Sequence, residues 1–374
     1  MVREIVFVAG EVSGDLHAAG VARELVARGA PYRLVGIGGD RMRDAGVELI
    51  EHSAHLAVMG FVEVLGTIGR HWGLLKDLKR RFRSGNVAAV VLIDYPDFNM
   101  LVANAAKAAG VPVLYYITPQ VWAWRAGRLD TLAKTVTKAA VILPFEEPLL
   151  RKHGIDVTFV GHPLLDHVGT LPSRDEARAS LGIAPDARVL AMFPGSRRQE
   201  IEHHVEGFAG TALELQRRDP SLEVIVAAAP HVTIDPERWP FRVVRGSSFS
   251  LLRAADAALC KSGTTTLEAS VAGCPFVLAY RTGQLNYAIA RRVIRVDTIG
   301  LVNLVAGYPL AQEFVQDALQ PARVADALEP LLDPSDSRRQ TMIDGLARVR
   351  DALGQPGAAA RVAEMAIELA ARRA

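Results

Sequence analysis

Short apolar runs alternate along this chain with amphipathic segments. The runs are brief and rich in branched residues, which is typical of buried strands, whereas the segments between them have helical spacing. In the first half of the chain, strands are predicted at Ile5–Ala9, Arg33–Gly36, Ala88–Ile93, Pro112–Ile117, Ala139–Leu143 and Val157–Val160. Helices are predicted between them, for example at Asp15–Arg28 and Leu101–Gly110. This alternation indicates a parallel sheet covered by helices.

The same alternation starts again in the second half. An irregular segment is predicted after Gly161-His162-Pro163. Ser173 with Glu176 then forms a capping box for a helix that stops near Gly182. Further strands are predicted at Val189–Phe193, Glu223–Ala228, Ala257–Cys260 and Phe276–Ala279. We therefore predict an α/β protein with two Rossmann-like, doubly wound domains, residues 1–168 and 169–345. The remaining residues, 346–374, are expected to form a C-terminal helix that packs back on the first domain or on a partner subunit.

Composition narrows the function. The chain has 374 residues, half of them apolar, which is enough for two hydrophobic cores. A net charge of +2 argues against a nucleic-acid binder that works through global charge. Cys260 and Cys274 show no disulfide or metal-ligand spacing, so a reducing, cytoplasmic location is expected. No apolar run approaches the roughly 18–20 residues of a spanning helix, so we expect any membrane contact to be peripheral.

Two turns have the plan of phosphate-binding sites. Residues 189–199 and 257–268 each contain an apolar run that breaks at small and hydroxyl residues before a helix begins. The N–H groups of a first helical turn attract anions, and Gly195 and Gly263 would let a phosphate come close to the backbone. Arg197 adds a full positive charge, and two such turns suit a nucleotide sugar. The alternative is structural, since Ser196–Gln199 and Thr265–Glu268 also have capping-box spacing.

Two carboxylates are candidates for acid–base chemistry. Asp94 and Asp97 follow a predicted strand, with Pro96 between them, so one of them can serve as a base at the sheet edge. Alternatively, at least one of the pair caps the next helix. His162 is a candidate for binding a sugar or diphosphate, or else a buried histidine bonded to the backbone. His17, His203 and His204 have no partners at metal-site spacing, so no metal is predicted.

A stripe of apolar residues recurs at helical spacing between Met59 and Arg83, with basic residues on the other surfaces. Its candidate membrane or lipid contacts are Phe61, Val64, Leu65, Ile68 and Trp72. Such a stripe with a basic end is typical of an interfacial membrane helix, and equally of a helix packed on a sheet. The glycines within it favour the membrane interpretation, because they weaken a helix built only for stability.

Eight segments together resemble the lipid-A-disaccharide synthase family. They are Ala9–Asp15, Met59–Val64, Asp94–Asn99, Pro119–Arg125, Leu143–Glu146, Phe159–Pro163, Pro194–Arg197 and Ser262–Glu268. They occur in order along most of the chain, and the block Pro119–Arg125 is the most specific. The resemblance implies the GT-B architecture, in which two Rossmann-like domains face a central crevice.

The resemblance also implies a reaction. In this metal-independent, inverting transfer the 6-hydroxyl of 2,3-diacylglucosamine 1-phosphate (lipid X) attacks the anomeric carbon of UDP-2,3-diacylglucosamine, giving the β-1,6-linked disaccharide phosphate of lipid A and UDP. Asp97 would be the base, with Asp94 or His17 as alternatives, and Arg197 would stabilise the leaving UDP. No cofactor is implied.

Further site residues follow from the resemblance. The donor site would comprise Gly195, Ser196, Arg197, Ser262, Gly263, Thr264, Thr265, Glu268 and Asn303, with Glu268 accepting the ribose hydroxyls. The acceptor side of the crevice would comprise Gly10, Glu11, Gly14, Gln120, Trp122 and His162. The protein would work on the cytoplasmic face of the inner membrane of a Gram-negative-type bacterium, as a monomer or an oligomer, with no nucleic-acid partner.

Two alternatives have different consequences. A UDP-GlcNAc 2-epimerase of the GT-B type, or a glycosyltransferase with a soluble acceptor, would keep both phosphate turns but would not need the apolar stripe. A non-catalytic, membrane-associated sensor of nucleotide sugars would need the turns and the stripe, but not Asp97.

Overall fold

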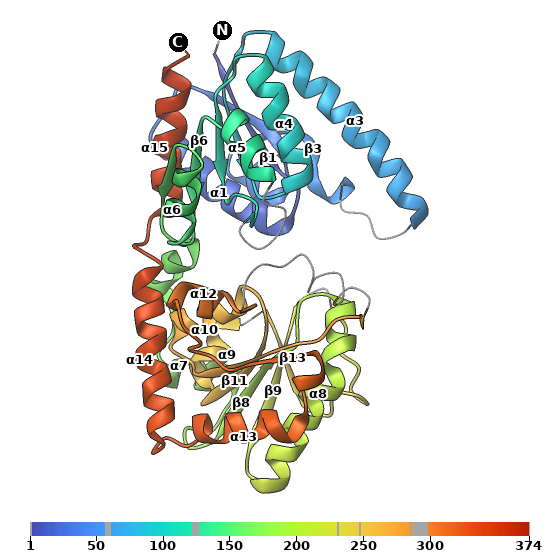
Figure 1. The fold of residues 1–374 in the computed structure, drawn as a ribbon, viewed down its shortest axis with the longest axis vertical. Helices are drawn as coiled ribbons and strands as arrows, with labels where there is room; N and C mark the ends of the chain where they lie inside the picture. Colours follow the sequence, from blue (N-terminus) through green and yellow to red (C-terminus); the bar gives the residue numbers. More distant parts are fainter. Residues whose placement is uncertain are drawn as a thin grey trace. The chain divides into compact units, whose positions relative to one another are not determined.

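The computed structural model describes residues 2–56, 61–121, 127–229, 232–246, 248–284, 287 and 298–373, with residues 61–68 described for their backbone alone. The chain divides into two compact units (Figure 1). Unit 1 comprises Met1–Pro163 and Gln355–Ala374, and unit 2 comprises Leu164–Gly354. Each unit is built around one parallel sheet.

Unit 1 contains a seven-stranded parallel sheet in the order β3-β2-β1-β4-β5-β6-β7. Its strands are β1 (Glu4–Ala9), β2 (Arg33–Gly38), β3 (Glu48–His52), β4 (Val87–Ile93), β5 (Val113–Tyr116), β6 (Lys138–Val141) and β7 (Val157–Phe159). Central strands β1 and β4 are buried along their whole length, because helices cover both faces. The strand order reverses between β1 and β4.

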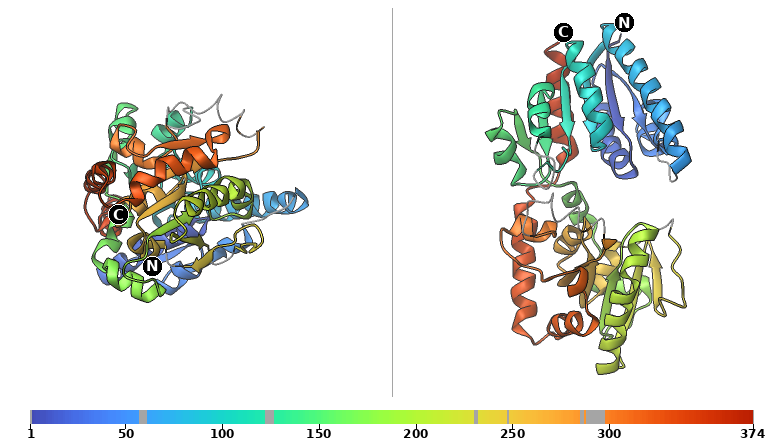
Figure 2. Two further views of the ribbon diagram at one scale, coloured as in Figure 1. Left: turned by 90° about the horizontal axis from the view of Figure 1, so that it is seen from below. Right: turned by 45° about the vertical axis from the view of Figure 1, so that its right-hand side comes forward.

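Two helical layers cover this sheet. Its helices are α1 (Val12–Ala27), α2 (Asp40–Asp44), η1 (Ser53–His55), α3 (Phe61–Arg83), α4 (Pro96–Ala108), α5 (Arg128–Thr135), α6 (Glu146–Lys152) and α15 (Ala358–Ala371). Apolar side chains of α3, α4 and α5 share one core with the sheet, and those of α1, α2 and α15 share the other. The 23-residue helix α3 packs along α4 (Figure 1, Figure 2).

Unit 2 contains a six-stranded parallel sheet in the order β10-β9-β8-β11-β12-β13. Its strands are β8 (Val189–Phe193), β9 (Glu223–Ala228), β10 (Arg242–Arg245), β11 (Ala257–Lys261), β12 (Phe276–Tyr280) and β13 (Glu313–Val315). Here the strand order reverses between β8 and β11. The two sheets therefore share the doubly wound plan that the sequence predicts.

The helices of unit 2 form two groups. They are η2 (Pro163–Thr170), α7 (Arg174–Leu181), α8 (Arg198–Arg218), α9 (Ser248–Ala254), α10 (Thr265–Ala272), α12 (Leu301–Ala306), η3 (Gln316–Ala318), α13 (Pro321–Leu332) and α14 (Ser337–Ala352). Helix α8 packs against α13, whereas α10 packs against α9, α12 and α14. The predicted capping box of α7 is confirmed, because Ser173 and Glu176 bond each other's backbone N–H groups and Gly182 ends the helix in a left-handed conformation.

The C-terminal segment differs from the expected single helix over 346–374. Its first residues complete α14 in unit 2, and after Gly354 and Gly357, both with positive φ, the chain enters α15 in unit 1. Helix α15 packs against α1 and β4, and Arg361 donates to the Val160 carbonyl at 2.9 Å. Unit 2 begins at Leu164, slightly before the expected boundary at residue 169. Among the described residues, no helix is long and apolar enough to cross a membrane.

Candidate functional site

Each sheet brings two turns together where its strand order reverses. Ligands of open α/β sheets bind outside the carboxyl ends of the strands at this point. In unit 1, β1 leads to Gly10 and the neighbouring β4 leads to Asp94, and Ala9 pairs with Ile93 at the end of the ladder. In unit 2, β8 leads to the turn at Gly195 and β11 to the turn at Gly263. The candidate turns therefore lie at the carboxyl ends of the central strands of each sheet.

The turn after β4 has an unusual backbone. Asp94 and Tyr95 both have positive φ, 48° and 49°, a region that residues other than glycine seldom adopt and that is frequent at functional sites. The buried side chain of Asn99 holds this turn, donating to the carbonyls of Asp94 at 2.7 Å and Ile93 at 3.2 Å. The Tyr115 hydroxyl donates to the same Asp94 carbonyl at 2.9 Å. These bonds hold the backbone from which the Asp94 side chain projects.

The two carboxylates have different surroundings. Burial raises the pKa of Asp94, and the nearby charge of Glu11 raises it further. Asp97 lies in the first turn of α4, is largely exposed, and forms an ion pair with Arg128. The residue that caps α4 is Tyr95, so neither aspartate holds that position. Asp97 thus lies beside a cation, whereas Asp94 favours its neutral form more than an ordinary aspartate does.

Tyr95 connects this turn to its neighbours. A Cβ atom on Gly10 would overlap the Tyr95 ring, so only glycine fits there. The Tyr95 hydroxyl is hydrogen-bonded to Nε2 of His71 in α3, and both rings pack against Phe98. The sequence pattern indicates the segment Asp94–Asn99 but no role for Tyr95, Asn99 or His71. Their roles depend on contacts between distant segments, which spacing alone does not show.

The other acceptor-side candidates of unit 1 lie in different environments. Gly14 packs closely against Ala9 and the Ile93 carbonyl, and Glu11 is exposed. His162 is buried, and burial together with nearby His17 lowers its pKa to about 3, so its imidazole is neutral. Gln120 is exposed in the segment that follows β5, and Trp122 lies outside the described residues.

The turn after β8 has the geometry of an anion site. Gly195 has φ 132°, and the Ser196 and Arg197 N–H groups both point to the Glu200 carboxylate, at 3.0 and 3.3 Å. A capping box does form at this helix start, but between Arg197 and Glu200 and not between Ser196 and Gln199 as in the structural alternative. The Lys261 ammonium lies 3.0 Å from the other Glu200 oxygen. Burial alone would raise the pKa of Glu200, but Lys261 and the Ser196 N–H bring it below its usual value.

The turn after β11 does not form the capping box that the structural alternative required. Thr264 occupies the cap position without a side-chain cap, and Thr265 begins α10. Glu268 is hydrogen-bonded to Ser248 of α9, and burial raises its pKa despite that bond. Gly263 has φ 150°, and the Ser262 hydroxyl donates to the Ile299 carbonyl at 2.8 Å. Glu268 therefore bonds to α9 and does not cap the start of its own helix.

Asn303 is engaged within unit 2. Its amide nitrogen donates to the Ala311 carbonyl and to Glu313, and its oxygen accepts from the Ala311 N–H, all at 2.8 Å. The side chain is buried. These contacts give Asn303 a structural role, and its predicted contact with the UDP-sugar stays a prediction.

Helix α3 combines buried and exposed members of the apolar stripe. Leu75 and Leu78 are buried in the core of unit 1, whereas the Trp72 side chain is 61% exposed. The side chains of the other stripe candidates, Phe61, Val64, Leu65 and Ile68, lie outside the described residues. The carboxyl-terminal half of α3 is thus a packed helix, and the membrane interpretation concerns only its amino-terminal half.

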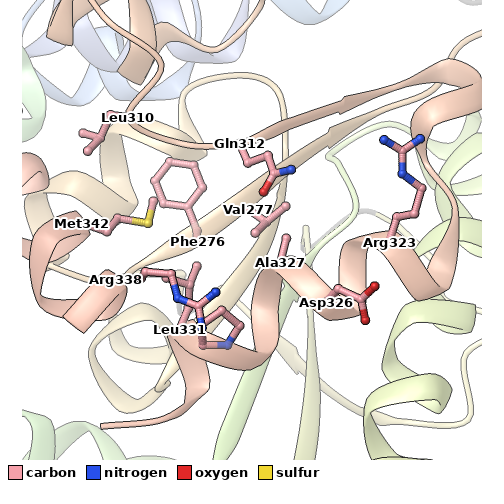
Figure 3. A pocket seen from close by; sticks show the side chains of 11 residues that line it. Phe276, Val277, Leu310, Gln312, Arg323, Asp326, Ala327, Leu331, Arg338 and Met342 are labelled. Carbon is pink, nitrogen blue, oxygen red and sulfur yellow. The ribbon is translucent and has the colours of Figure 1, made fainter. Parts of the chain in front are cut away.

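Two cavities lie away from these turns. A cavity of about 380 Å³ in unit 2 is lined by residues of β12, α13 and α14, among them Phe276, Arg323 and Met342 (Figure 3). Because Phe276 begins β12, this cavity lies at the amino end of the sheet. A second cavity of about 360 Å³ in unit 1 is lined by Glu4 at the start of β1. In the described part of the chain, no group of three His, Cys, Asp or Glu side chains could hold a metal ion.

Solved structures with the same fold include glycosyltransferases and epimerases. The glycotransferase of kitacinnamycin covers 98% of this chain and 99% of its own length, with 17% identity and a TM-score of 0.64. MurG of Acinetobacter baumannii covers 96% and 98%, with 14% identity and a TM-score of 0.61. At these identities the likeness shows the fold alone, which is the GT-B fold of two Rossmann-like units.

Sequence comparison adds the family. Lipid-A-disaccharide synthase of Syntrophus aciditrophicus is 42% identical over 98% of this chain and 97% of its own length. The enzyme of the same name from Geobacter metallireducens is 41% identical over 99% and 98%. The model of the lipid-A-disaccharide synthetase family matches residues 5–366. The chain therefore belongs to the lipid-A-disaccharide synthetase family and is a glycosyltransferase.

Proposed function

We propose that this protein transfers 2,3-diacylglucosamine from UDP-2,3-diacylglucosamine to the 6-hydroxyl of 2,3-diacylglucosamine 1-phosphate, giving the β-1,6-linked disaccharide phosphate of lipid A and UDP. The observation that carries the proposal is the family match over residues 5–366, together with the two turns of unit 2 that suit a nucleoside diphosphate. The transfer inverts the anomeric configuration, because the acceptor hydroxyl attacks the face opposite the leaving UDP.

Unit 2 holds the donor in this proposal. The N–H groups of Ser196 and Arg197 and the Arg197 guanidinium bind the diphosphate and stabilise the charge that grows on it as UDP leaves. These groups supply the positive charge that a metal ion provides in other transferases, so the reaction needs no metal. Glu268, beside the second turn, accepts the ribose hydroxyls.

Unit 1 acts on the acceptor. Asp97 removes the proton of the attacking hydroxyl. Its exposed carboxylate, paired with Arg128, favours it over Asp94, whose pKa is raised by burial. The acceptor contacts that we propose are Gly10, Glu11, Gly14, Gln120, Trp122 and His162. The neutral imidazole of His162 suits a hydrogen bond to a sugar or phosphate rather than an ion pair.

The acylated substrates fix where the protein works. Each buried methylene contributes about 0.8 kcal/mol, so two-chain lipids stay in the bilayer and the enzyme must reach them there. We place the protein peripherally on the cytoplasmic face of the inner membrane, with the amino-terminal half of α3 and its exposed Trp72 at the lipid surface.

One experiment separates this activity from its alternatives: UDP release from the diacylated donor, measured with and without the acylated acceptor in mixed micelles. Release that requires the acylated acceptor, with the disaccharide phosphate formed in equal amount, is the expected result. Release with a water-soluble sugar acceptor, epimerised UDP-sugar, or donor binding without any release would contradict the proposal.

A further inference from the structure

A carboxylate occupies the anion site of the β8 turn. Glu200, the third residue of α8, folds back over the start of its own helix. One of its oxygens accepts from the Ser196 and Arg197 N–H groups, and the other lies 3.0 Å from the Lys261 ammonium and 3.5 Å from the Arg197 guanidinium. Two backbone donors and two cations on one anionic group form the same donor set that binds a phosphate.

The position of this carboxylate matches the space that a phosphate would need. A Cβ atom on Gly195 would lie 2.6 Å from a Glu200 oxygen, so the carboxylate is in contact with the open side of this glycine. A Cβ atom on Gly263 would lie 3.7 Å from the Lys261 nitrogen. The Glu200–Lys261 pair therefore connects the two turns, with one residue contributed from each.

A phosphate and the Glu200 carboxylate cannot both accept the same two N–H groups. Each N–H donates one bond, and two anions at this separation repel each other. In the structure Glu200 accepts hydrogen bonds from both N–H groups, and its side chain is only 17% exposed. A diphosphate that uses the turn must therefore displace it.

We propose that the Glu200 carboxylate is an internal substitute for the donor diphosphate: it occupies the β8 turn when the donor is absent and yields the Ser196 and Arg197 N–H groups and the Lys261 ammonium when the UDP moiety binds. Lys261 then becomes a contact of the diphosphate. When UDP leaves, the carboxylate returns to the turn, which favours product release. The inference rests on the proposed function, since it concerns the same donor site.

The test is the dissociation constant of UDP, measured by titration calorimetry for the wild type, Glu200→Gln and Glu202→Gln. Glu202 is the matched control, because it lies in the same helix and pairs with Arg198 at 2.9 Å without touching the turn. Glu200→Gln is expected to bind UDP roughly tenfold more tightly, the factor that about 1.4 kcal/mol represents, and Glu202→Gln within twofold of the wild type. Adding Lys261→Met to Glu200→Gln should weaken UDP binding again, because the ammonium then has the diphosphate as its partner.

A second measurement covers the stability of the variant. If the Glu200 contacts are lost when UDP binds, the difference in Tm between wild type and Glu200→Gln becomes smaller at saturating UDP. Glu200→Asp, which keeps the charge but is too short to reach the turn, replaces Glu200→Gln if that variant does not fold.

If Glu200→Gln, or Glu200→Asp in its place, binds UDP no more tightly than the wild type while Glu202→Gln is unchanged, the carboxylate only supports the turn. That result would overturn the inference. Absence of UDP binding by the wild type would instead overturn the proposed donor site.

Discussion

We expect His204 to make the stability of unit 2 depend on pH. It is fully buried in α8, and its Nε2 atom accepts the Arg281 N–H at 2.9 Å, so this nitrogen carries no proton. The rings of Phe208 and Tyr280 pack against it, with centroids 5.2 and 5.9 Å away. Burial lowers the pKa of His204 from its usual 6.5 to about 4.

The sign and size of the effect follow from linkage. Between pH 6.5 and pH 4 the unfolded chain takes up a proton at this position and the folded unit does not, so the free energy of unfolding falls as the pH falls. Each unit of pH in this window costs about 1.4 kcal/mol, which gives a loss of about 2 kcal/mol between pH 7 and pH 5. Below pH 4 both states are protonated, and the loss levels off at about 3 kcal/mol.

The assay compares wild type with His204→Gln, since glutamine keeps an acceptor for the Arg281 N–H but does not titrate in this range. Urea unfolding is followed by the fluorescence of Trp239, which is buried in unit 2 beside Phe208, in a background where the other tryptophans are phenylalanine. Other titrating groups cancel in the difference between the two proteins. A difference that stays constant from pH 7 to pH 5 would refute the reasoning.

Three further predictions concern the proposed site. Arg197→Ala should raise the UDP dissociation constant and slow transfer together, as steady-state kinetics would show, because its charge acts before and during UDP departure; a change in stability alone would mean that the turn is structural. Gly10→Ala should displace the Tyr95 ring, cost about 1–3 kcal/mol in urea unfolding and lower turnover, while UDP affinity, which belongs to unit 2, stays unchanged. Trp72→Ser should weaken binding to anionic vesicles at little cost in stability, whereas Leu78→Ala, at a buried position of the same helix, should cost about 2–5 kcal/mol. Vesicle binding that survives Trp72→Ser unchanged would remove α3 from the membrane proposal.

The central strands were predictable from the sequence, but three edge strands were not. Strands such as β4 and β8 are buried on both faces, so they are continuous apolar runs that a pattern detects. Strands β3, β10 and β13 have a neighbour on one side only, and their partly exposed residues include charged ones such as Glu48 and Arg242. Such strands take their conformation from the sheet that they join, not from their own composition.

The places of the candidate turns were predictable from the sequence, but their internal contacts were not. Three segments follow strands at the two points where the strand order reverses, as the sequence predicts: Asp94–Asn99 after β4, Pro194–Arg197 after β8 and Ser262–Glu268 after β11. The contact of Glu200 with Lys261 joins residues far apart in the chain, and the capping-box rule selected Gln199 because it counts positions only. The left-handed backbone at Asp94 and Tyr95 likewise depends on Asn99 and Tyr115 around it.

The most direct test of the account is the turnover of Asp97→Asn with saturating donor and acylated acceptor, measured beside Asp94→Asn from the same turn. Removal of a general base should lower turnover at least about a hundredfold in Asp97→Asn, with UDP binding retained, because the donor site lies in unit 2. Asp94→Asn should retain much more activity. Near-normal turnover of Asp97→Asn, with the loss transferred to Asp94→Asn, would contradict the assignment of the base and with it the mechanism proposed for unit 1.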